Sequence, residues 1–174
     1  GVYLFSVPDV YIRDYFVTTD LDLNYRNAML NIKAKVRNTG ESDLEKIIVT
    51  ARLFDAGGKE ISFFTRGLKI LERGTEQEVY LQRSVQNPLK WSAEKPHLYT
   101  VVLELKDPDG RVIEIVEEKV GFREYEIKNA QLLMKGVPIM IKGVTLHEHD
   151  PYHGRTMSTE IIEKDVQVMQ ELNV

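Results

Sequence analysis

The feature that most restricts the fold of this chain is an alternation of apolar and polar side chains that recurs between Val10 and Val120. In the segment Ala28–Arg37, every second residue is apolar, and most of the residues between them are polar. A period of two residues is typical of a strand with one buried face. About seven such segments follow one another: Val10–Val17, Ala28–Arg37, Lys46–Phe54, Glu60–Thr65, Glu76–Ser84, Leu98–Leu105 and Val112–Val120.

Turn-forming residues separate these segments, and helical periodicity is absent up to Phe122. Asp107-Pro108-Asp109-Gly110 has Pro at the second turn position and Gly at the fourth, which indicates a hairpin. Gly57 and Gly58 lie in another turn and allow positive φ. The number and spacing of the segments predict an all-β fold, an immunoglobulin-like β-sandwich of about seven antiparallel strands over residues 10–122.

The composition excludes several kinds of site and partner. The chain contains no cysteine, so disulfides, thiolate nucleophiles and Cys-based zinc sites are excluded. Its 23 Lys and Arg residues against 27 Asp and Glu give a net charge of -4 without a basic block, so nucleic acid is not an expected partner. A membrane role is not expected either, because no apolar run is long enough to span a bilayer. The isolated His97 is interpreted as structural or surface-exposed.

The last third of the chain has a different pattern. Gln131–Met134 and Pro138–Ile141 flank a glycine-containing turn and predict one more hairpin. Gly143–His147 is predicted to be a strand that leads into a loop rich in ionisable groups. From Ser158, the predicted N-cap, apolar residues recur at intervals of three and four, which indicates an amphipathic helix with a core-facing side. The apolar positions are Ile161, Ile162, Val166, Met169 and Leu172.

A strand, a loop and a helix together form one β/α unit, which buries its strand only beside further strands. We therefore expect residues 123–174 to be the truncated opening of a (β/α)8 barrel. The predicted helix is about sixteen residues long and close to the ~12–15-residue limit for isolated helices, so we expect it to pack on the sandwich or another copy, or to fray. The unpaired edge at Gly143–His147 makes self-association a further expectation.

A histidine-rich segment, His147–Asp150, lies where β/α barrels carry catalytic groups. Three interpretations remain open. His147 and His149 could bind a metal ion together with His153 or Asp150. The segment could instead be an ordinary polar loop. In the third interpretation, an imidazole hydrogen-bonds a sugar hydroxyl more strongly in the transition state than in the ground state.

Three segments resemble, in order and spacing, the family 2 glycoside hydrolases, and within that family the β-galactosidases. They are Asn87–Tyr99, which contains Trp91-Ser92-Ala93-Glu94-Lys95-Pro96, then Val120–Arg123, and Gly143–Gly154 with its His-Glu-His-Asp-Pro sequence. The family's β-glucuronidases usually read differently after the His-Glu pair, and its β-mannosidases lack that pair. The resemblance therefore favours a β-galactosidase.

The resemblance also implies a domain organisation and a mechanism. Residues 1–9 would be the exit from a sugar-binding jelly roll, residues 10–122 a structural linker sandwich, and residues 123–174 the start of the catalytic barrel. A retaining hydrolase of terminal β-D-galactosides uses two glutamates about 5 Å apart, and both would lie beyond Val174. The Mg²⁺ ligands of the parent enzyme would also lie beyond Val174. The parent enzyme is a candidate homo-oligomer. The fragment itself is expected to have no cofactor, no metal site and no activity.

One active-site residue is implied within this chain. His147 matches the family histidine that contacts a galactosyl hydroxyl and stabilises the transition state, whereas Glu148 has at most a supporting role. Thr145-Leu146 replaces the family's usual Asn-Arg, which removes a planar five-donor guanidinium, and Lys135-Gly136-Val137 replaces Asn-Gly-Lys. The substrate is therefore open. The alternative functions are those of another family 2 glycosidase, a β-glucuronidase, and of a non-catalytic immunoglobulin-like binding module. The sequence does not indicate a localisation.

Overall fold

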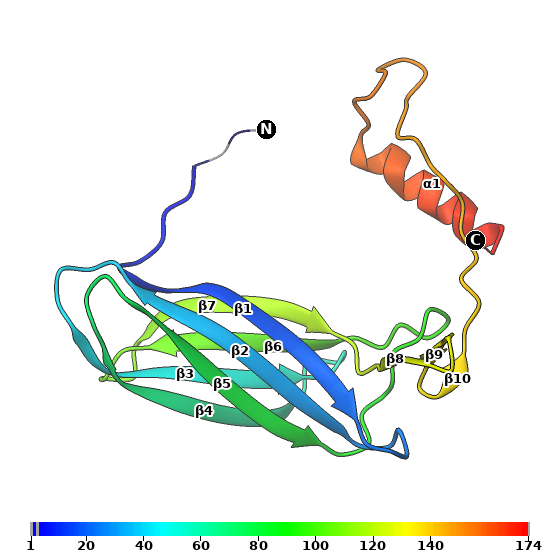
Figure 1. Cartoon of the computed structure of the whole chain (residues 1–174). Helices are drawn as coiled ribbons and strands as arrows, with labels where there is room; N and C mark the ends of the chain where they lie inside the picture. Colours follow the sequence, from blue (N-terminus) through cyan, green and yellow to red (C-terminus); the bar gives the residue numbers. More distant parts are fainter. Residues whose placement is uncertain (1, 3, 174) are drawn as a thin grey trace. The chain divides into compact units, whose positions relative to one another are not determined.

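The computed structural model describes residues 2 and 4–173 of the chain. The chain divides into two compact units, Gly1–Tyr125 and Glu126–Val174 (Figure 1). The first unit contains seven long strands, and the second contains the helix.

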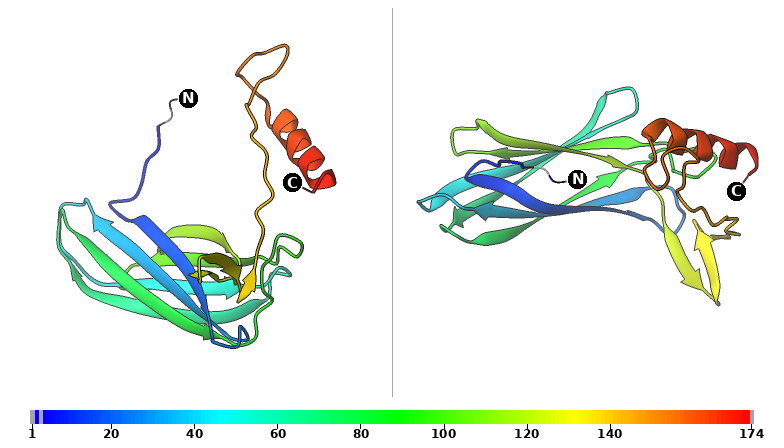
Figure 2. Two further views of the ribbon diagram at one scale, coloured as in Figure 1. Left: turned by 45° about the vertical axis from the view of Figure 1, so that its right-hand side comes forward. Right: turned by 90° about the horizontal axis from the view of Figure 1, so that it is seen from above.

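Seven antiparallel strands form the first unit as two facing sheets (Figures 1 and 2). One sheet has the order β1-β2-β5 and the other has the order β4-β3-β6-β7. The strands are β1 (Val10–Leu21), β2 (Ala28–Asn38), β3 (Leu44–Phe54), β4 (Glu60–Leu71), β5 (Glu76–Val85), β6 (Tyr99–Lys106) and β7 (Val112–Val120). The immunoglobulin-like sandwich predicted from the sequence is thereby confirmed.

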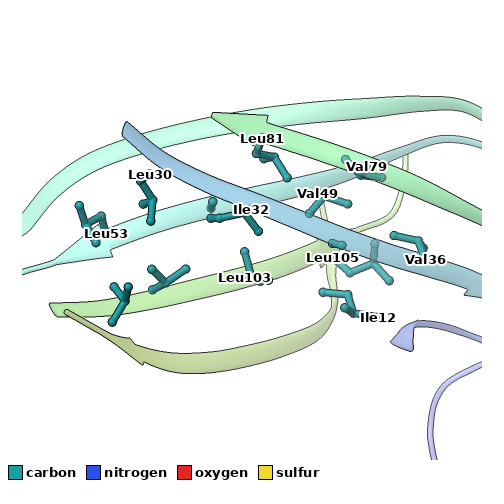
Figure 3. Close-up of a cluster of buried hydrophobic side chains, with 14 of the residues drawn as sticks. Ile12, Leu30, Ile32, Val36, Val49, Leu53, Val79, Leu81, Leu103 and Leu105 are labelled. Carbon is teal, nitrogen blue, oxygen red and sulfur yellow. The ribbon is translucent and has the colours of Figure 1, made fainter. Parts of the chain in front are cut away.

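The hydrophobic core lies between the two sheets, because alternate residues of the central strands point inward (Figure 3). Fully burying a side chain such as Val or Leu contributes about 1.5–3 kcal/mol relative to leaving it exposed. The core can therefore stabilise a sandwich that has no cysteine. Core residues that are at most 1% exposed include Leu30, Ile32, Ala34, Val36, Ile47, Val49, Ala51, Leu53, Val101, Leu103 and Leu105.

One polar side chain, that of Asn38, is completely buried at the end of β2. Its Nδ2 donates hydrogen bonds to the carbonyl oxygens of Ser42 at 2.9 Å and Leu71 at 3.1 Å. Its Oδ1 accepts a hydrogen bond from the backbone N–H of Gly40 at 2.9 Å. Because buried polar groups are costly when they are unpaired, this amide stabilises the connection between β2 and the end of β4.

Side chains and backbone groups close the open edge between β1 and β7, which belong to different sheets. Three contacts join the two strands, and the residue number rises along β1 and along β7 from one contact to the next. Ile12 N donates to Glu114 Oε2 at 2.5 Å, Tyr15 Oη to Glu118 Oε2 at 3.2 Å, and Thr19 Oγ1 to the carbonyl oxygen of Gly121 at 3.2 Å. The neighbouring edges of β1 and β7 therefore run in the same direction.

The strand boundaries mostly agree with those predicted, and β7 agrees at both ends. The largest difference is in β4, which was predicted to end at Thr65 but continues to Leu71. Gly67 lies opposite Ile48 of β3, so the ladder continues through a glycine, a residue that usually weakens the interior of a strand. The hairpin predicted around Pro108 is confirmed, because Gly110 N donates to the carbonyl oxygen of Asp107 at 3.0 Å.

The second unit begins with a small antiparallel sheet of order β10-β9-β8. Its strands are β8 (Tyr125–Lys128), β9 (Gln131–Met134) and β10 (Val137–Pro138). The predicted hairpin forms, with positive φ at Lys135 and Gly136, but its second strand is Val137–Pro138 and not the predicted Pro138–Ile141. The first of the three strands, β8, was not predicted.

One prediction about the remainder of this unit is wrong. No strand forms at Gly143–His147, because the described chain offers this segment no partner strand. The helix α1 (Thr159–Glu171) forms where predicted, with Ser158 at the N-cap position, but it is only 13 residues long and none of its residues is buried. The expectation that this helix packs on the sandwich or on another copy, or else frays, stays a prediction. Within the described residues, no helix is long and apolar enough to cross a bilayer.

Candidate functional site

The predicted site residue, His147, lies in the segment between the small sheet and α1. Residues 139–149 have no regular secondary structure, and His147, Glu148 and His149 are all exposed. Within the described part of the chain, no side chain hydrogen-bonds the His147 imidazole. The imidazole is therefore accessible to a ligand. Glu148, for which only a supporting role was expected, also lies open to solvent.

Asp150 differs from its neighbours, because its side chain is buried within a tight loop. Its backbone forms an antiparallel bridge with Gly154, whose φ is +66°, through hydrogen bonds of 2.7 and 2.9 Å. Asp150 Oδ1 accepts hydrogen bonds from the backbone amides of Tyr152 at 2.8 Å and His153 at 2.6 Å, and it lies 2.8 Å from His153 Nδ1. A single carboxylate thus holds the whole loop.

The electrostatics of this loop follow from the same contacts. Burial raises the pKa of Asp150, but hydrogen bonds from the Tyr152 and His153 amides and from the His153 ring outweigh burial, so the pKa lies below its usual range. The His153 side chain itself is 71% exposed to solvent.

This geometry bears on the three interpretations of the histidine-rich segment. In the described residues, no three His, Asp or Glu side chains gather in the way that a metal ion requires. Asp150 and His153, considered above as metal ligands, instead bind each other. Asp150–Gly154 therefore forms an ordered loop, and the exposed His147 is compatible with contact to a sugar hydroxyl.

The helix that follows starts with a different contact from the one predicted. Ser158 has an extended backbone at the N-cap position, but its side chain makes no capping hydrogen bond. Its hydroxyl instead binds the carboxylate of Glu160, and this contact, together with a backbone amide, lowers the pKa of Glu160. An acidic residue in the first turn also interacts favourably with the helix dipole.

In the first unit, two of the resembling segments, Asn87–Tyr99 and Val120–Arg123, meet around Trp91. The backbone N–H of Trp91 donates to the carbonyl oxygen of Phe122 at 3.0 Å. The Arg123 guanidinium lies 4.6 Å from the centroid of the Trp91 ring and 5.4 Å from that of Tyr125. A Cβ atom at Gly121 would lie only 2.8 Å from Trp91 Cβ and Cγ. The indole therefore packs directly on the glycine backbone.

The adjacent Phe122 anchors the same corner in the core. It is completely buried, and its ring meets that of Tyr99 edge to face, with 4.9 Å between centroids. The Tyr99 hydroxyl accepts a hydrogen bond from the backbone N–H of Leu89 at 2.8 Å. These two segments therefore have a structural role. Their contact was not predicted from the sequence, and neither was the Asp150–His153 pair, for which the three-residue spacing was the available signal.

Comparison with family models covers both units. Residues 10–123 match the model described as glycosyl hydrolases family 2, and residues 125–174 match that of the family's TIM barrel domain. The chain belongs to glycosyl hydrolases family 2. The hairpin, loop and helix of the second unit therefore correspond to part of a family 2 barrel domain.

Individual relatives agree with this assignment. A beta-galactosidase from Priestia megaterium is 37% identical over 99% of this chain and 17% of its own length. A family 2 glycosyl hydrolase from Bacteroides cellulosilyticus has a TM-score of 0.84 at 21% identity, over 95% of this chain and 23% of that one. A Parabacteroides merdae beta-glucuronidase has a TM-score of 0.77 at 24% identity, over 96% of this chain and 21% of that one. The chain spans 16–18% of the curated family 2 relatives it matches.

Proposed function

We propose that the enzyme to which this chain belongs hydrolyses terminal non-reducing β-D-galactosides with retention of configuration. The observation that carries the proposal is the match over 99% of this chain to relatives named beta-galactosidase, at 31–37% identity. The family 2 structures named beta-glucuronidase are 24% identical or less, so they support the fold and not the substrate.

In this proposal the first unit is a structural linker and the second contributes to the catalytic barrel. Retaining hydrolysis uses one carboxylic acid as the general acid and a second carboxylate as the nucleophile, about 5–5.5 Å apart. We assign both glutamates, and the Mg²⁺ ligands of the parent enzyme, to residues outside this 174-residue sequence. Residues 1–9 are proposed as the connection from a jelly roll, and the parent enzyme as a homo-oligomer.

His147 is the one residue of this chain that we place at the substrate. Its exposed imidazole would hydrogen-bond a galactosyl hydroxyl, with a stronger bond in the transition state than in the ground state. Removing a hydrogen bond of this kind costs roughly 10²–10³-fold in kcat. His149 is equally exposed and lies two residues away, so it provides a matched control.

The complete enzyme that contains this sequence should be assayed with p-nitrophenyl β-D-galactoside and p-nitrophenyl β-D-glucuronide. We expect hydrolysis of the galactoside, with kcat reduced roughly 100-fold in His147→Asn and nearly unchanged in His149→Asn. Preferential hydrolysis of the glucuronide would refute the substrate assignment, and equal effects of the two substitutions would refute the role of His147.

The 174-residue chain by itself provides a separate test. We expect it to hydrolyse neither substrate, because the proposed mechanism assigns both carboxylates to residues it does not contain. Release of nitrophenol by the purified chain, above that of a heat-denatured sample, would contradict this part of the proposal.

A further inference from the structure

The outer face of the three-stranded sheet presents two exposed aromatic side chains in one cross-strand row. Phe16 of β1 lies opposite Lys33 of β2, which lies opposite Tyr80 of β5. Phe16 is 67% exposed and Tyr80 is 59% exposed. With neighbouring strands about 4.8 Å apart, the two aromatic residues are separated by roughly 10 Å of backbone. This row is called the aromatic row below.

The next row along the same face consists of hydrogen-bonding side chains. Thr18 lies opposite Asn31, which lies opposite Gln82. Gln82 Nε2 donates a hydrogen bond to Asn31 Oδ1 at 2.9 Å, so each amide is oriented and keeps its other polar atom for a ligand. This row is called the amide row.

A shallow hollow of about 190 Å³ lies between these two rows. Phe16, Lys33 and Tyr80 line one part of it, the amide row lines another, and Ile32 and Leu81 complete the lining. A second hollow of about 300 Å³ lies on the other side of Phe16 and Lys33, beside Asp14 and Lys35. The Phe16 ring therefore stands between two recesses of the sheet surface.

Contacts within the sheet hold Lys33 and Tyr80 in place. Lys33 Nζ lies 2.7 Å from Glu78 Oε1 and 5.5 Å from the centroid of the Tyr80 ring. The Tyr80 hydroxyl donates a hydrogen bond to Glu78 Oε2 at 2.5 Å. Side chains that are already ordered lose less entropy when a ligand binds. Tyr80 is then a fixed wall of the hollow, and Phe16 is the ring available for stacking.

We propose that this face binds a neutral saccharide chain, with one sugar unit in the hollow between the aromatic row and the amide row. A pyranose ring has faces of C–H groups that stack on an aromatic ring and an edge of hydroxyl groups that both donate and accept hydrogen bonds. The two rows offer these complementary features side by side. This site is separate from the proposed galactosidase chemistry and does not depend on it.

A protein partner fits the face less well. The centre of a protein interface is usually a continuous apolar area depleted of charge. Here the charged residue Lys33 separates the two aromatic residues, and the next row on the other side, Asp14, Lys35 and Glu78, consists entirely of charged side chains. Charged and amide groups at these positions would have to be desolvated by a protein, whereas sugar hydroxyls can replace their bound water.

Affinity electrophoresis of the 174-residue chain in native gels tests the site. The gels contain soluble β-1,4-galactan, barley β-glucan or dextran, and a gel without polysaccharide serves as the reference. We expect retardation in at least one of these gels and a dissociation constant at least tenfold higher for Phe16→Ala. Tyr80→Ala should weaken binding less. Tyr152→Ala provides the matched control, because this tyrosine is 90% exposed and belongs to the other unit.

Each result either supports or overturns the proposal. Retardation that is lost in Phe16→Ala and kept in Tyr152→Ala supports it, provided that circular dichroism shows the same thermal unfolding for all variants. Normal migration of the unsubstituted 174-residue chain in all three gels overturns it. Retardation that Phe16→Ala leaves unchanged, or sedimentation showing that this substitution abolishes self-association without any saccharide effect, also overturns it. None of these readouts depends on glycosidase activity.

Discussion

Replacing Gly121 by alanine tests the packing of Trp91 most directly. The added Cβ would lie 2.8 Å from Trp91 Cβ and Cγ, closer than non-bonded carbon atoms approach. Trp91 Cβ is next to the backbone, so a rotation of the indole does not relieve the contact. The Trp91 segment has to move, although its backbone N–H is bonded to the Phe122 carbonyl oxygen and its ring to Arg123.

The expected cost follows from these contacts. Overpacking a well-packed site costs about 1–3 kcal/mol, and displacement of the guanidinium from the ring adds about 0.5–1 kcal/mol. We expect the free energy of unfolding to fall by about 2–3 kcal/mol in total. At about 4 °C per kcal/mol for a domain of this size, the midpoint of thermal unfolding should fall by roughly 8–12 °C.

Urea and thermal unfolding, followed by circular dichroism and Trp91 fluorescence, measure this change. Gly67→Ala is the matched control, because the nearest atom to its new Cβ is 3.9 Å away and its φ is not positive. Alanine in the strand should be neutral or stabilising there. In a Trp91→Ala background, the Gly121→Ala penalty should disappear. A loss below about 0.5 kcal/mol, or a penalty that persists without the indole, would refute the reasoning.

Two further predictions concern polar groups. Asn38→Ala should lower the free energy of unfolding by about 1–3 kcal/mol, because it leaves buried backbone groups without partners; urea unfolding that is unchanged would contradict this. Asp150 has a folded pKa below its usual value, so the hydrogen bonds of its loop should contribute fully above about pH 4 and be lost as the pH falls through that folded pKa. The amide shifts of Tyr152 and His153 in NMR spectra should report this titration, and their failure to move, or an identical titration in Asp150→Asn, would contradict the assignment.

The sandwich was accessible from the sequence because one face of each strand is buried. In β2 and β3 the apolar residues occupy alternate positions, so a local pattern was sufficient to locate both strands. The extension of β4 beyond Thr65 was not predicted, because it depends on pairing with another strand, as Gly67 pairs with Ile48 of β3. The allocation of strands to two sheets also depends on contacts between residues far apart in the sequence.

The candidate site was only partly predictable. The Gly143–His147 segment has strand-like residues, but a strand also needs a partner, and local composition does not provide one. The assignment of His147 rests on resemblance and stays a prediction. The Asp150–His153 contact forms because the carboxylate hydrogen-bonds groups of its own loop. The same residue types had also suggested metal ligands, so the sequence did not distinguish the two roles.

The bridges between β1 and β7 have a mechanical consequence. The chain enters the sandwich at the Val10 end of β1 and leaves it after the Val120 end of β7, and the contacts near Ile12, Tyr15 and Thr19 join edges that run in the same direction. Tension applied through the flanking segments would therefore load these contacts in shear, all at once, rather than opening them one by one. We expect single-molecule pulling to show one high-force rupture of the sandwich, and a lower rupture force in Thr19→Ala, which loses its bond to the Gly121 carbonyl.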